Sequence, residues 1–309
     1  MFDHYSVMMK ESINMLNINP EGIYVDMTLG GAGHSSQIYE KLSSKGKLIC
    51  FDQDIVAIEN AKEVFKEKEN VYIINSNFAN LKEELAKINI TKVDGILFDL
   101  GVSSVQFDTP ERGFSYRYDA RLDMRMDQDA SLSAYEIIND FSFNDIVYIL
   151  RAYGDEKFAK QIARTIEKKR LIKPIETTFE LVDAIKESLP QAVLKKKGHP
   201  AKKTFQALRI AVNKELDVFE QALLDAVDIL NVNGRIAVIT FHSGEDKICK
   251  RIFKQLTTSK IPKNIPVFVE DDIDFRLINT KSIVPSNEEL HENNRSHSSR
   301  LRVIEKIKW

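Results

Sequence analysis

The sequence predicts an α/β protein: a doubly wound, mostly parallel sheet with an inserted helical domain. Strand-like and helix-like segments alternate with short links up to about residue 100, which is typical of a parallel sheet covered by helices. After Gly101 this alternation stops, and a long stretch shows apolar residues at helical spacing only. An apolar strand that begins near residue 235 then resumes the sheet.

A run of strand–helix units is expected before Gly101. Short apolar runs rich in β-branched residues predict buried strands, and apolar residues three or four positions apart predict the helices between them. The expected elements are a strand at 22–28, a helix at 35–42, a strand at 47–52, a helix at 55–65, a strand at 71–75, a helix at 81–88 and a strand at 93–100.

After Gly101 the chain is expected to form a loop and then helices. Residues 102–126 are rich in Ser, Asp, Arg and Tyr without a sustained period, which predicts a long loop. Helical spacing with polar or proline-containing breaks predicts several short helices at 132–194. One long helix is expected at 204–230, with Gly234 as its stop. Then follow a strand at 235–241, a helix at 245–256, a strand at 275–283 and a last strand at 301–307.

The composition is that of an ordinary globular protein of two domains. The chain has 309 residues, 43% hydrophobic and 29% charged, and domains average roughly 150 residues. The two cysteines, Cys50 and Cys249, are too few for a disulfide framework or a four-cysteine zinc site. No metal is therefore expected. Because no segment has the length and apolarity of a signal peptide or a membrane span, we expect a cytoplasmic protein without a membrane partner.

Charge is distributed unevenly along the chain. The formal net charge is −2, yet residues 151–214 hold 16 Lys and Arg against 7 Asp and Glu, a balance of +9 that leaves −11 for the rest. Such a basic segment favours a polyphosphate partner, although a solvated helical surface is the alternative. We expect a sheet domain of residues 1–107 and 204–309, interrupted by a basic, mainly helical domain of residues 108–203.

A glycine-rich turn joins the first expected strand to its helix. Residues 26–35 read DMTLGGAGHS, and glycines there allow a tight turn and close approach of the backbone to a ligand at the helix N-terminus. The turn therefore suits a nucleotide-like cofactor. Ser36 stands where the third glycine of a dinucleotide fingerprint would be, so a tight turn without a ligand stays open.

Polar and aromatic residues follow the next strand ends, which meet at one edge of a parallel sheet. Asp52 ends the second strand, where a carboxylate can accept both ribose hydroxyls of an adenosine, while Asp54 is the better candidate for capping the next helix. Phe78 either covers an adenine ring or belongs to the core. Asp99 either accepts a hydrogen bond from an amine or caps the following turn.

Three segments suit contacts with nucleic acid. Lys202 and Lys203 stand beside His199 and Phe205, so this segment could hold phosphates and stack a base. His242 follows the strand at 235–241, and the polar stretch 294–302 suits a loop that contacts an anion.

Several long motifs span nearly the whole chain: HYSVMMKE at 4–11, the turn at 26–35, DLGVSS at 99–104, RGFS at 112–115, LDMRMD at 122–127, residues 199–216 and TFHS at 240–243. Together these motifs resemble the ribosomal RNA small subunit methyltransferase H family, the S-adenosylmethionine-dependent bacterial 16S rRNA cytosine-N4 methyltransferases. Two departures from its pattern concern the expected RNA side: Gly244 stands where Leu is usual, and NNRSHS at 293–298 replaces NPRSRS.

The resemblance implies a Rossmann-like methyltransferase domain that binds S-adenosylmethionine and an inserted domain that recognises RNA. The implied partner is 16S rRNA within the small ribosomal subunit or its precursor, methylated on a cytidine of the decoding region. The implied cofactor-binding residues are Gly31, Ala32, Gly33, His34, Asp52, Phe78, Asp99 and Gln106. The expected RNA-binding residues are His199, Lys202, Lys203, Arg209, His242 and Arg295.

The chemistry expected is direct attack of the exocyclic N4 on the sulfonium methyl group, with loss of one proton. Because the N4 lone pair is delocalised, the protein must align it and accept a hydrogen bond from its N–H. Asp99 and Ser103 are the candidate catalytic residues, although the usual Pro-Pro after the acidic residue is replaced by Leu100-Gly101. Tyr116, Tyr118 or His242 could hold the unstacked base.

Three other functions stay open. An NAD-dependent oxidoreductase would share the glycine turn and Asp52 but does not explain the basic segment. A non-catalytic RNA-binding assembly factor would keep the fold, and a DNA cytosine-N4 methyltransferase would share the chemistry. It also stays open whether the helical insertion clamps RNA, mediates contacts in a homodimer, or does both.

Overall fold

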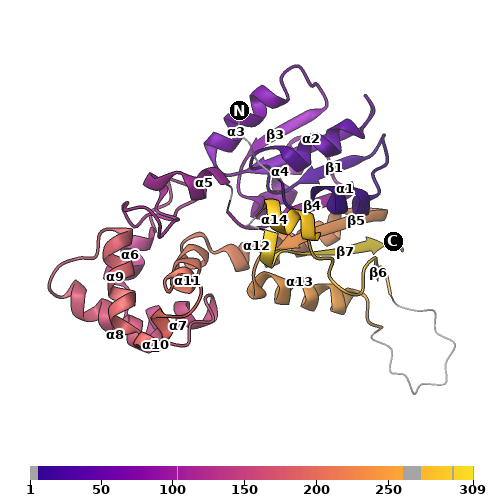
Figure 1. Cartoon of the computed structure of the whole chain (residues 1–309). Coiled ribbons are helices and arrows are strands. Elements are labelled where there is room, and N and C mark those ends of the chain that lie inside the picture. The colour runs from indigo at the N-terminus through magenta and orange to yellow at the C-terminus, as the bar shows by residue number, and fades with distance from the viewer. Residues whose placement is uncertain (1–5, 103, 260–272, 294–295, 309) are drawn as a thin grey trace, which may run out of the picture. The chain divides into compact units, whose positions relative to one another are not determined.

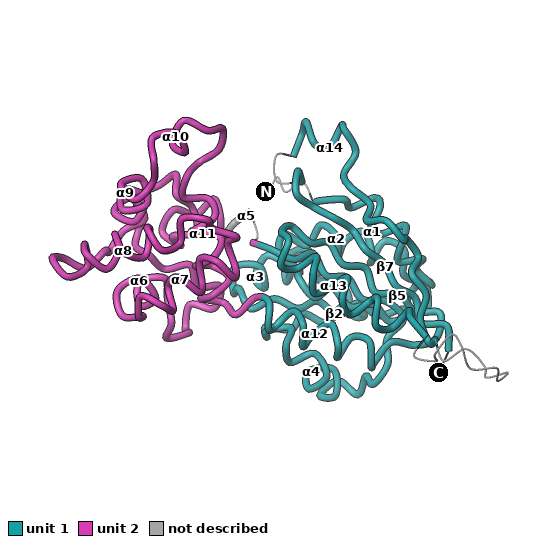
Figure 2. Tube along the Cα trace, turned by 90° about the horizontal axis from the view of Figure 1, so that it is seen from below, with its two compact units in different colours: residues 1–101, 216–309 teal, residues 102–215 magenta. Residues whose placement is uncertain are grey.

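The computed structural model describes residues 6–102, 104–259, 273–293 and 296–308. The chain divides into two compact units, one of Met1–Gly101 with Leu216–Trp309 and one of Val102–Glu215 (Figure 2). We call them the sheet unit and the helical unit. The helical unit extends further at both ends than the insertion of residues 108–203 expected from the sequence.

The sheet unit contains a seven-stranded sheet in the order β3-β2-β1-β4-β5-β7-β6 (Figure 1). The five neighbouring strands β3, β2, β1, β4 and β5 are parallel to one another. β7 pairs antiparallel with both β5 and β6. This order confirms the predicted doubly wound, mostly parallel sheet. The strands are β1 (Ile23–Asp26), β2 (Lys47–Asp52), β3 (Val71–Asn75), β4 (Val93–Asp99), β5 (Leu230–Thr240), β6 (Phe275–Leu277) and β7 (Arg300–Lys306).

Helices cover this sheet, and side chains cap the starts of α3, α13 and α14. Asp54 caps α3 by accepting a hydrogen bond from the Val56 N–H at 3.1 Å, as the sequence indicated. The helices are α1 (Met9–Leu16), α2 (Gly33–Glu40), α3 (Ile55–Val64), α4 (Leu81–Lys87), α12 (Glu215–Ile229), α13 (Ser243–Leu256) and α14 (Asn287–Glu292), with 3-10 turns η1 (Phe78–Asn80) and η3 (Ser296–Ser298).

The helical unit packs its own core of aliphatic side chains. Ser133 and Thr177 each form a capping box with the glutamate three residues later, Glu136 and Glu180. The expected loop at 102–126 holds a short helix and a 3-10 turn. The elements of the unit are α5 (Ser104–Asp108), η2 (Pro110–Arg112), α6 (Ala134–Asp140), α7 (Phe143–Ala152), α8 (Ala159–Arg170), α9 (Thr178–Ser188), α10 (Gln191–Leu194) and α11 (Lys202–Asn213).

The single helix predicted at 204–230 is wrong. Lys214 adopts a left-handed conformation with φ of 50°, which ends α11 and separates it from α12. Gly234 does not stop a helix either, because β5 already begins at Leu230 and continues through a left-handed Asn233. The register between β4 and β5 shifts there, so the strand tolerates the irregular residue.

The predicted strand at 275–283 is also shorter than expected. β6 covers only Phe275–Leu277, after which Ile283 forms an isolated bridge with Leu301.

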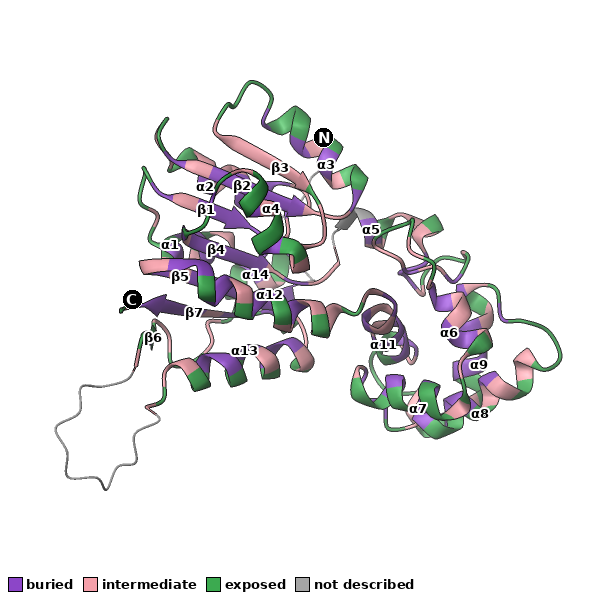
Figure 3. Ribbon diagram, turned by 180° about the vertical axis from the view of Figure 1, so that it is seen from behind, coloured by how far each residue is buried: buried purple, intermediate pink, exposed green. Residues whose placement is uncertain are grey.

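The strands β1, β2, β4, β5 and β7 are mostly buried, whereas β3 and β6 at the two edges of the sheet are more exposed (Figure 3). Tyr24 on β1 is only 2% exposed and packs over Gly95 of the neighbouring β4. Its hydroxyl oxygen accepts a hydrogen bond from the Asn19 N–H at 2.7 Å, which fixes the ring. Gly95 is therefore required by the close approach of an aromatic ring, not by its backbone angles.

We expect Gly95→Ala to destabilise the protein by about 1–3 kcal/mol, the usual cost of overpacking a core. The added Cβ would lie 2.5 Å from Tyr24 Cε1, and the hydrogen bond at the Tyr24 hydroxyl opposes movement of the ring. Urea unfolding measures the cost. In a Tyr24→Leu background the same change should cost much less; an equal cost in both backgrounds would contradict this explanation.

Candidate functional site

The site residues of the sheet unit gather where the parallel strands end. Residues 27–33 follow β1, Asp52 ends β2, Asn77 follows β3 and Asp99 ends β4. In an open α/β sheet, ligands bind outside the carboxyl ends of the strands. The structure therefore brings together most of the residues that the sequence predicted for a cofactor.

Two residues of the glycine-rich turn adopt a left-handed conformation. Gly30 has φ of +49° and Ala32 has φ of 64°, a conformation that glycine adopts readily and that alanine adopts only under constraint. A Cβ on Gly33 would collide with the Ser6 hydroxyl, so this glycine allows the N-terminal segment to pack on the turn. Gly31 lies between Gly30 and Ala32 in the turn.

Asp52 is oriented by the backbone around it. Its carboxylate oxygens accept hydrogen bonds from the N–H of Gly30 and from the N–H of Asp54, both at 2.9 Å. Burial raises the pKa of Asp52 to about 6, although those two hydrogen bonds oppose the rise. The two bonds leave lone pairs on both oxygens for further donors, and Asp54, not Asp52, caps α3.

Phe78 lies directly after β3, at the start of η1. The Asn77 side chain accepts from the Ala79 N–H and donates to the Gln53 side chain, so the ends of β2 and β3 are linked. The Phe78 ring is half-buried and packs edge-to-face on Phe98, with centroids 6.1 Å apart. The structure is therefore compatible with both interpretations of Phe78, because the ring contacts the core while part of the side chain is exposed.

Asp99 ends β4 beside the glycine turn. Its backbone N–H donates to the Thr28 hydroxyl at 2.8 Å. Its Oδ2 lies 3.4 Å from Nδ1 of His34, whose Nε2 lies 3.1 Å from the Val7 carbonyl oxygen. Its Oδ1 is buried and has no hydrogen-bond partner among the described residues. A buried carboxylate oxygen without a partner is costly, which marks it as an acceptor for a ligand.

Burial and charge act in opposite directions on the groups around Asp99. Burial alone would lower the pKa of His34, but the hydrogen bond and charge of Asp99, together with the charge of Asp26, raise it overall. Burial raises the pKa of Asp26, against the stabilising effect of His34 and of the 2.6 Å hydrogen bond from the Ser35 hydroxyl.

Three further residues expected at functional sites are outside the described part of the sheet unit. Gln106 is buried on α5 of the helical unit. Ser103, the second candidate catalytic residue, and Arg295, an expected RNA-binding residue, lie outside the described residues.

The helical unit carries the expected basic segment. His199 stacks on Tyr116 with ring centroids 4.1 Å apart and planes 5° from parallel. Burial, followed by the positive charges of Lys186 and Arg117, lowers the pKa of His199. The ring is therefore a neutral aromatic surface in a cationic environment. Phe205, expected beside it as a stacking surface, is only 3% exposed and packs on the edge of Tyr116, so that expectation is wrong.

The basic side chains around this stack differ in what they bind. Lys202 and Lys203 are exposed, and Lys203 donates to the Asp155 carbonyl oxygen at 2.9 Å. Arg209 is held by Glu215 through two hydrogen bonds of 2.8 and 2.9 Å. The lysines, more than Arg209, are therefore available to a polyanion.

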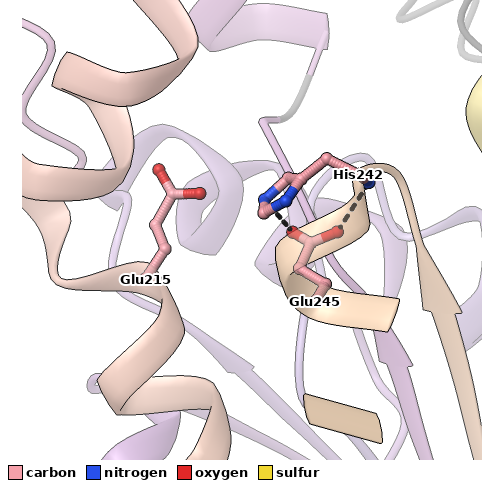
Figure 4. A group of neighbouring side chains, drawn as sticks. All are labelled: Glu215, His242 and Glu245. Carbon is pink, nitrogen blue, oxygen red and sulfur yellow. Dashed lines mark hydrogen bonds and ion pairs between the residues drawn. The ribbon is translucent and has the colours of Figure 1, made fainter. Parts of the chain in front are cut away.

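His242 caps helix α13 in the sheet unit. Its Nδ1 accepts a hydrogen bond from the Gly244 N–H, and Glu245 accepts from the backbone N–H of His242 (Figure 4). The ring is 8% exposed, and its Nε2 lies 3.1 Å from Glu245 Oε1. Its side chain thus serves the start of α13, and its expected contact with RNA stays a prediction.

Two contributors to the site around His34 and Asp99 were not predicted from the sequence. The backbone carbonyl of Val7 holds His34, and the carboxylate of Glu289 accepts a hydrogen bond from the Met8 N–H at 2.8 Å. The Ser-x-x-Glu pattern at 286–289 indicates a capping box. The Ser286 hydroxyl does accept from the Glu289 N–H, but the glutamate side chain instead reaches the other end of the chain.

Comparisons with known proteins agree along the whole chain. Residues 1–307 match the model of the MraW methylase family. The chain is 55% identical over 311 residues to ribosomal RNA small subunit methyltransferase H of Exiguobacterium sibiricum, and the match covers 100% of this chain and 99% of that protein. Among the described helices, none combines the length and apolarity needed to cross a membrane.

Solved structures match more weakly. A candidate rRNA-methylase from Clostridium thermocellum gives a TM-score of 0.46 at 13% identity, over 98% of this chain and 100% of that one. A candidate methyltransferase from Streptococcus mutans in complex with SAH gives a TM-score of 0.43 at 12% identity, over 98% of this chain and 100% of that one.

Proposed function

This chain belongs to the MraW methylase family, and we propose that it transfers a methyl group from S-adenosylmethionine to N4 of a cytidine in 16S rRNA. The observation that carries the proposal is 55% identity, along the full length, to a ribosomal RNA small subunit methyltransferase. The target cytidine lies in the decoding region, within the small subunit or its precursor, and the protein acts in the cytoplasm.

The strand ends of the sheet unit suit S-adenosylmethionine. Asp52 presents an oriented carboxylate where a ribose would lie, and Phe78, after the neighbouring strand β3, is half-exposed. The unpartnered Oδ1 of Asp99 fits the same group of residues. When bound, S-adenosylmethionine supplies an electrophilic methyl group. The turn residues Gly31, Ala32, Gly33 and His34 would surround it, and the contact of Gln106 stays a prediction.

Asp99 is the best-placed proton acceptor. The reacting amine must lose one proton as its bond to the methyl carbon forms, and general bases act within hydrogen-bond distance of the proton they remove. Oδ1 is available for that proton, since Oδ2 faces His34 and the described residues offer Oδ1 no donor. Both cysteines are buried, and burial strongly raises the pKa of each thiol, so neither suits a covalent attack on a base.

The helical unit would bind the RNA around the target. Its exposed lysines supply phosphate contacts, and the Tyr116–His199 stack supplies an aromatic surface for an unpaired base. The side chains of Arg209 and His242 already form hydrogen bonds within the protein.

A homodimer stays a prediction, which light scattering tests.

Charge reversal at both Lys202 and Lys203 should weaken RNA binding and leave the affinity for S-adenosylmethionine unchanged. Each lost phosphate contact should reduce the slope of log affinity against log salt by ~1. Filter binding at several salt concentrations measures the slope. The same reversal at Lys62 and Lys66, two exposed lysines of the sheet unit, is the matched control. An unchanged slope, or weaker cofactor binding, would contradict the prediction.

Methyl-labelled S-adenosylmethionine separates the alternatives. We expect label to enter small subunits from cells that lack this protein, and not duplex DNA. Labelled DNA would favour a DNA methyltransferase, and RNA binding without transfer would favour an assembly factor. If the protein binds NAD instead of S-adenosylmethionine in calorimetry, it is an oxidoreductase.

A further inference from the structure

One peptide group near the N-terminus is held from both sides. The Val7 carbonyl oxygen lies 3.1 Å from His34 Nε2, and the N–H of the same peptide, on Met8, donates to Glu289 Oε1 at 2.8 Å. Met8 adopts a left-handed conformation with φ of 50°, which starts α1. A residue of α14 thus holds the Val7 carbonyl in position, although this carbonyl lies near the N-terminus.

This contact fixes one proton on the His34 ring. A carbonyl oxygen can only accept a hydrogen bond, so Nε2 must carry a hydrogen. The state of the other nitrogen then follows from its neighbour, the Asp99 carboxyl, 3.4 Å away. A neutral ring would direct the Nδ1 lone pair at a carboxylate oxygen, which is repulsive. One further proton between Nδ1 and Oδ2 removes that repulsion.

The groups around His34 favour this extra proton. Asp99 on β4 and Asp26 on β1 are the charged groups that act on it, and both are acidic. Glu289 on α14 is close enough to interact with both Asp99 and His34, and Glu11 on α1 acts on Glu289. His34 is only 5% exposed, so water contributes little to the balance. The charges outweigh burial, and the pKa of His34 is raised.

We propose that His34 and Asp99 share one proton between Nδ1 and Oδ2, and that His34 is the positioning residue that holds Asp99 with Oδ1 directed at the reacting amine. This inference deepens the proposed function and rests on it. His34 supplies a hydrogen-bond donor to Oδ2, which leaves Oδ1 for the amine.

The proton balance of the step is simple. As the bond between N4 and the methyl carbon forms and the bond between that carbon and sulfur breaks, one proton leaves N4 for Asp99 Oδ1. The proton between Nδ1 and Oδ2 stays in place. The proton on Oδ1 passes to solvent after product leaves. His34 therefore touches neither the methyl group nor the base in this step.

Two substitutions of His34 separate its two nitrogens. His34→Asn places an amide N–H near the position of Nδ1 and keeps a neutral donor toward Asp99. His34→Gln places its amide near the position of Nε2 and keeps only the contact with Val7. At saturating S-adenosylmethionine, we expect kcat to fall more than 100-fold in His34→Gln and less than 10-fold in His34→Asn, whereas any loss of cofactor affinity should be similar in the two variants. His291→Asn, at an exposed histidine, is the matched control.

The proton itself can be observed without the reaction. In ¹⁵N-histidine NMR, both ring nitrogens of His34 should carry hydrogen at neutral pH in the wild type, and only one should do so in Asp99→Asn. The wild-type kcat should fall as pH rises through the raised pKa of His34, because the pair then loses its shared proton. In His34→Asn this alkaline limb should disappear.

A singly protonated His34 at neutral pH would overturn the inference, and so would a His34→Gln variant that loses cofactor affinity instead of kcat. In an Asp99→Asn background, His34→Gln should cost little further activity, and full additivity would also overturn it. If NMR shows the shared proton but the wild-type protein methylates no RNA, the proposed function fails while the proton assignment stands.

Discussion

Asp99→Asn should lower the rate of methyl transfer by about 10²–10⁴-fold, the range that general acid–base catalysis contributes. An amide has nearly the same shape as the carboxylate but cannot take the amine proton at neutral pH. It also removes the charge opposite His34, 3.4 Å away. The backbone hydrogen bond from Asp99 to the Thr28 hydroxyl does not depend on the side chain and should persist.

Single-turnover kinetics with saturating S-adenosylmethionine measures this loss, and calorimetry measures cofactor binding in the same variant. Asp217→Asn, at an exposed aspartate of α12, removes the same charge away from the site and should change neither value. A variant at Asp99 that transfers methyl groups within threefold of the wild-type rate would remove Asp99 from the chemistry and leave Ser103 as the candidate.

Asp52→Asn should weaken S-adenosylmethionine binding by about 10–100-fold. Hydrogen bonds to charged groups contribute about 1.5–3 kcal/mol each, and every 1.4 kcal/mol is about tenfold in affinity. In the wild type, the carboxyl group of Asp52 accepts from ribose hydroxyls most strongly while it is ionised. With a pKa of about 6, wild-type affinity should therefore fall as pH drops below about 6, and the variant should lack this dependence.

The same raised pKa affects the stability of the protein without cofactor, in the opposite direction. Burial of the ionised carboxylate costs free energy above pH about 6, and protonation relieves this cost as pH falls from about 6 toward the ordinary range of an aspartate near 3.9. Thermal unfolding should show this relief in the wild type and not in Asp52→Asn.

Asp54→Asn is the matched control for Asp52. Asparagine caps a helix about as well as aspartate, so α3 should remain intact and affinity at neutral pH should hold. Because the charge of Asp54 contributes to the raised pKa of Asp52, this control should also move the midpoint of the pH dependence to lower pH. A large loss of affinity in the control would contradict the assignment of roles to the two residues.

The parallel half of the fold could be predicted because its signals are local. β2 and β3 were predicted to the residue, since each is a short apolar run with polar boundaries. The division of the helix at Lys214 was not, because one lysine in a left-handed conformation leaves no trace in apolar spacing. β5 was predicted to start at Arg235, yet pairing with β4 extends it back to Leu230. Tertiary pairing there overrides a local signal.

The site was predictable where topology alone brings residues together. The glycine turn, Asp52 and Asp99 lie at the carboxyl ends of β1, β2 and β4, which are neighbours in the sheet, so the sheet order places them at one edge. The clamp on the Val7–Met8 peptide was not predictable, because Glu289 is 281 residues from Met8 in the chain. Its local sequence instead suggests an ordinary capping box, and only the folded chain shows where its side chain goes.

Mass spectrometry of nucleosides tests the central claim most directly. Small subunits from cells without this protein would be incubated with it and methyl-labelled S-adenosylmethionine, and their 16S rRNA digested to nucleosides and fragments. We expect label in N4-methylated cytidine, within a fragment of the decoding region. Label in another nucleoside, or none while calorimetry still detects cofactor binding, would contradict the proposed reaction.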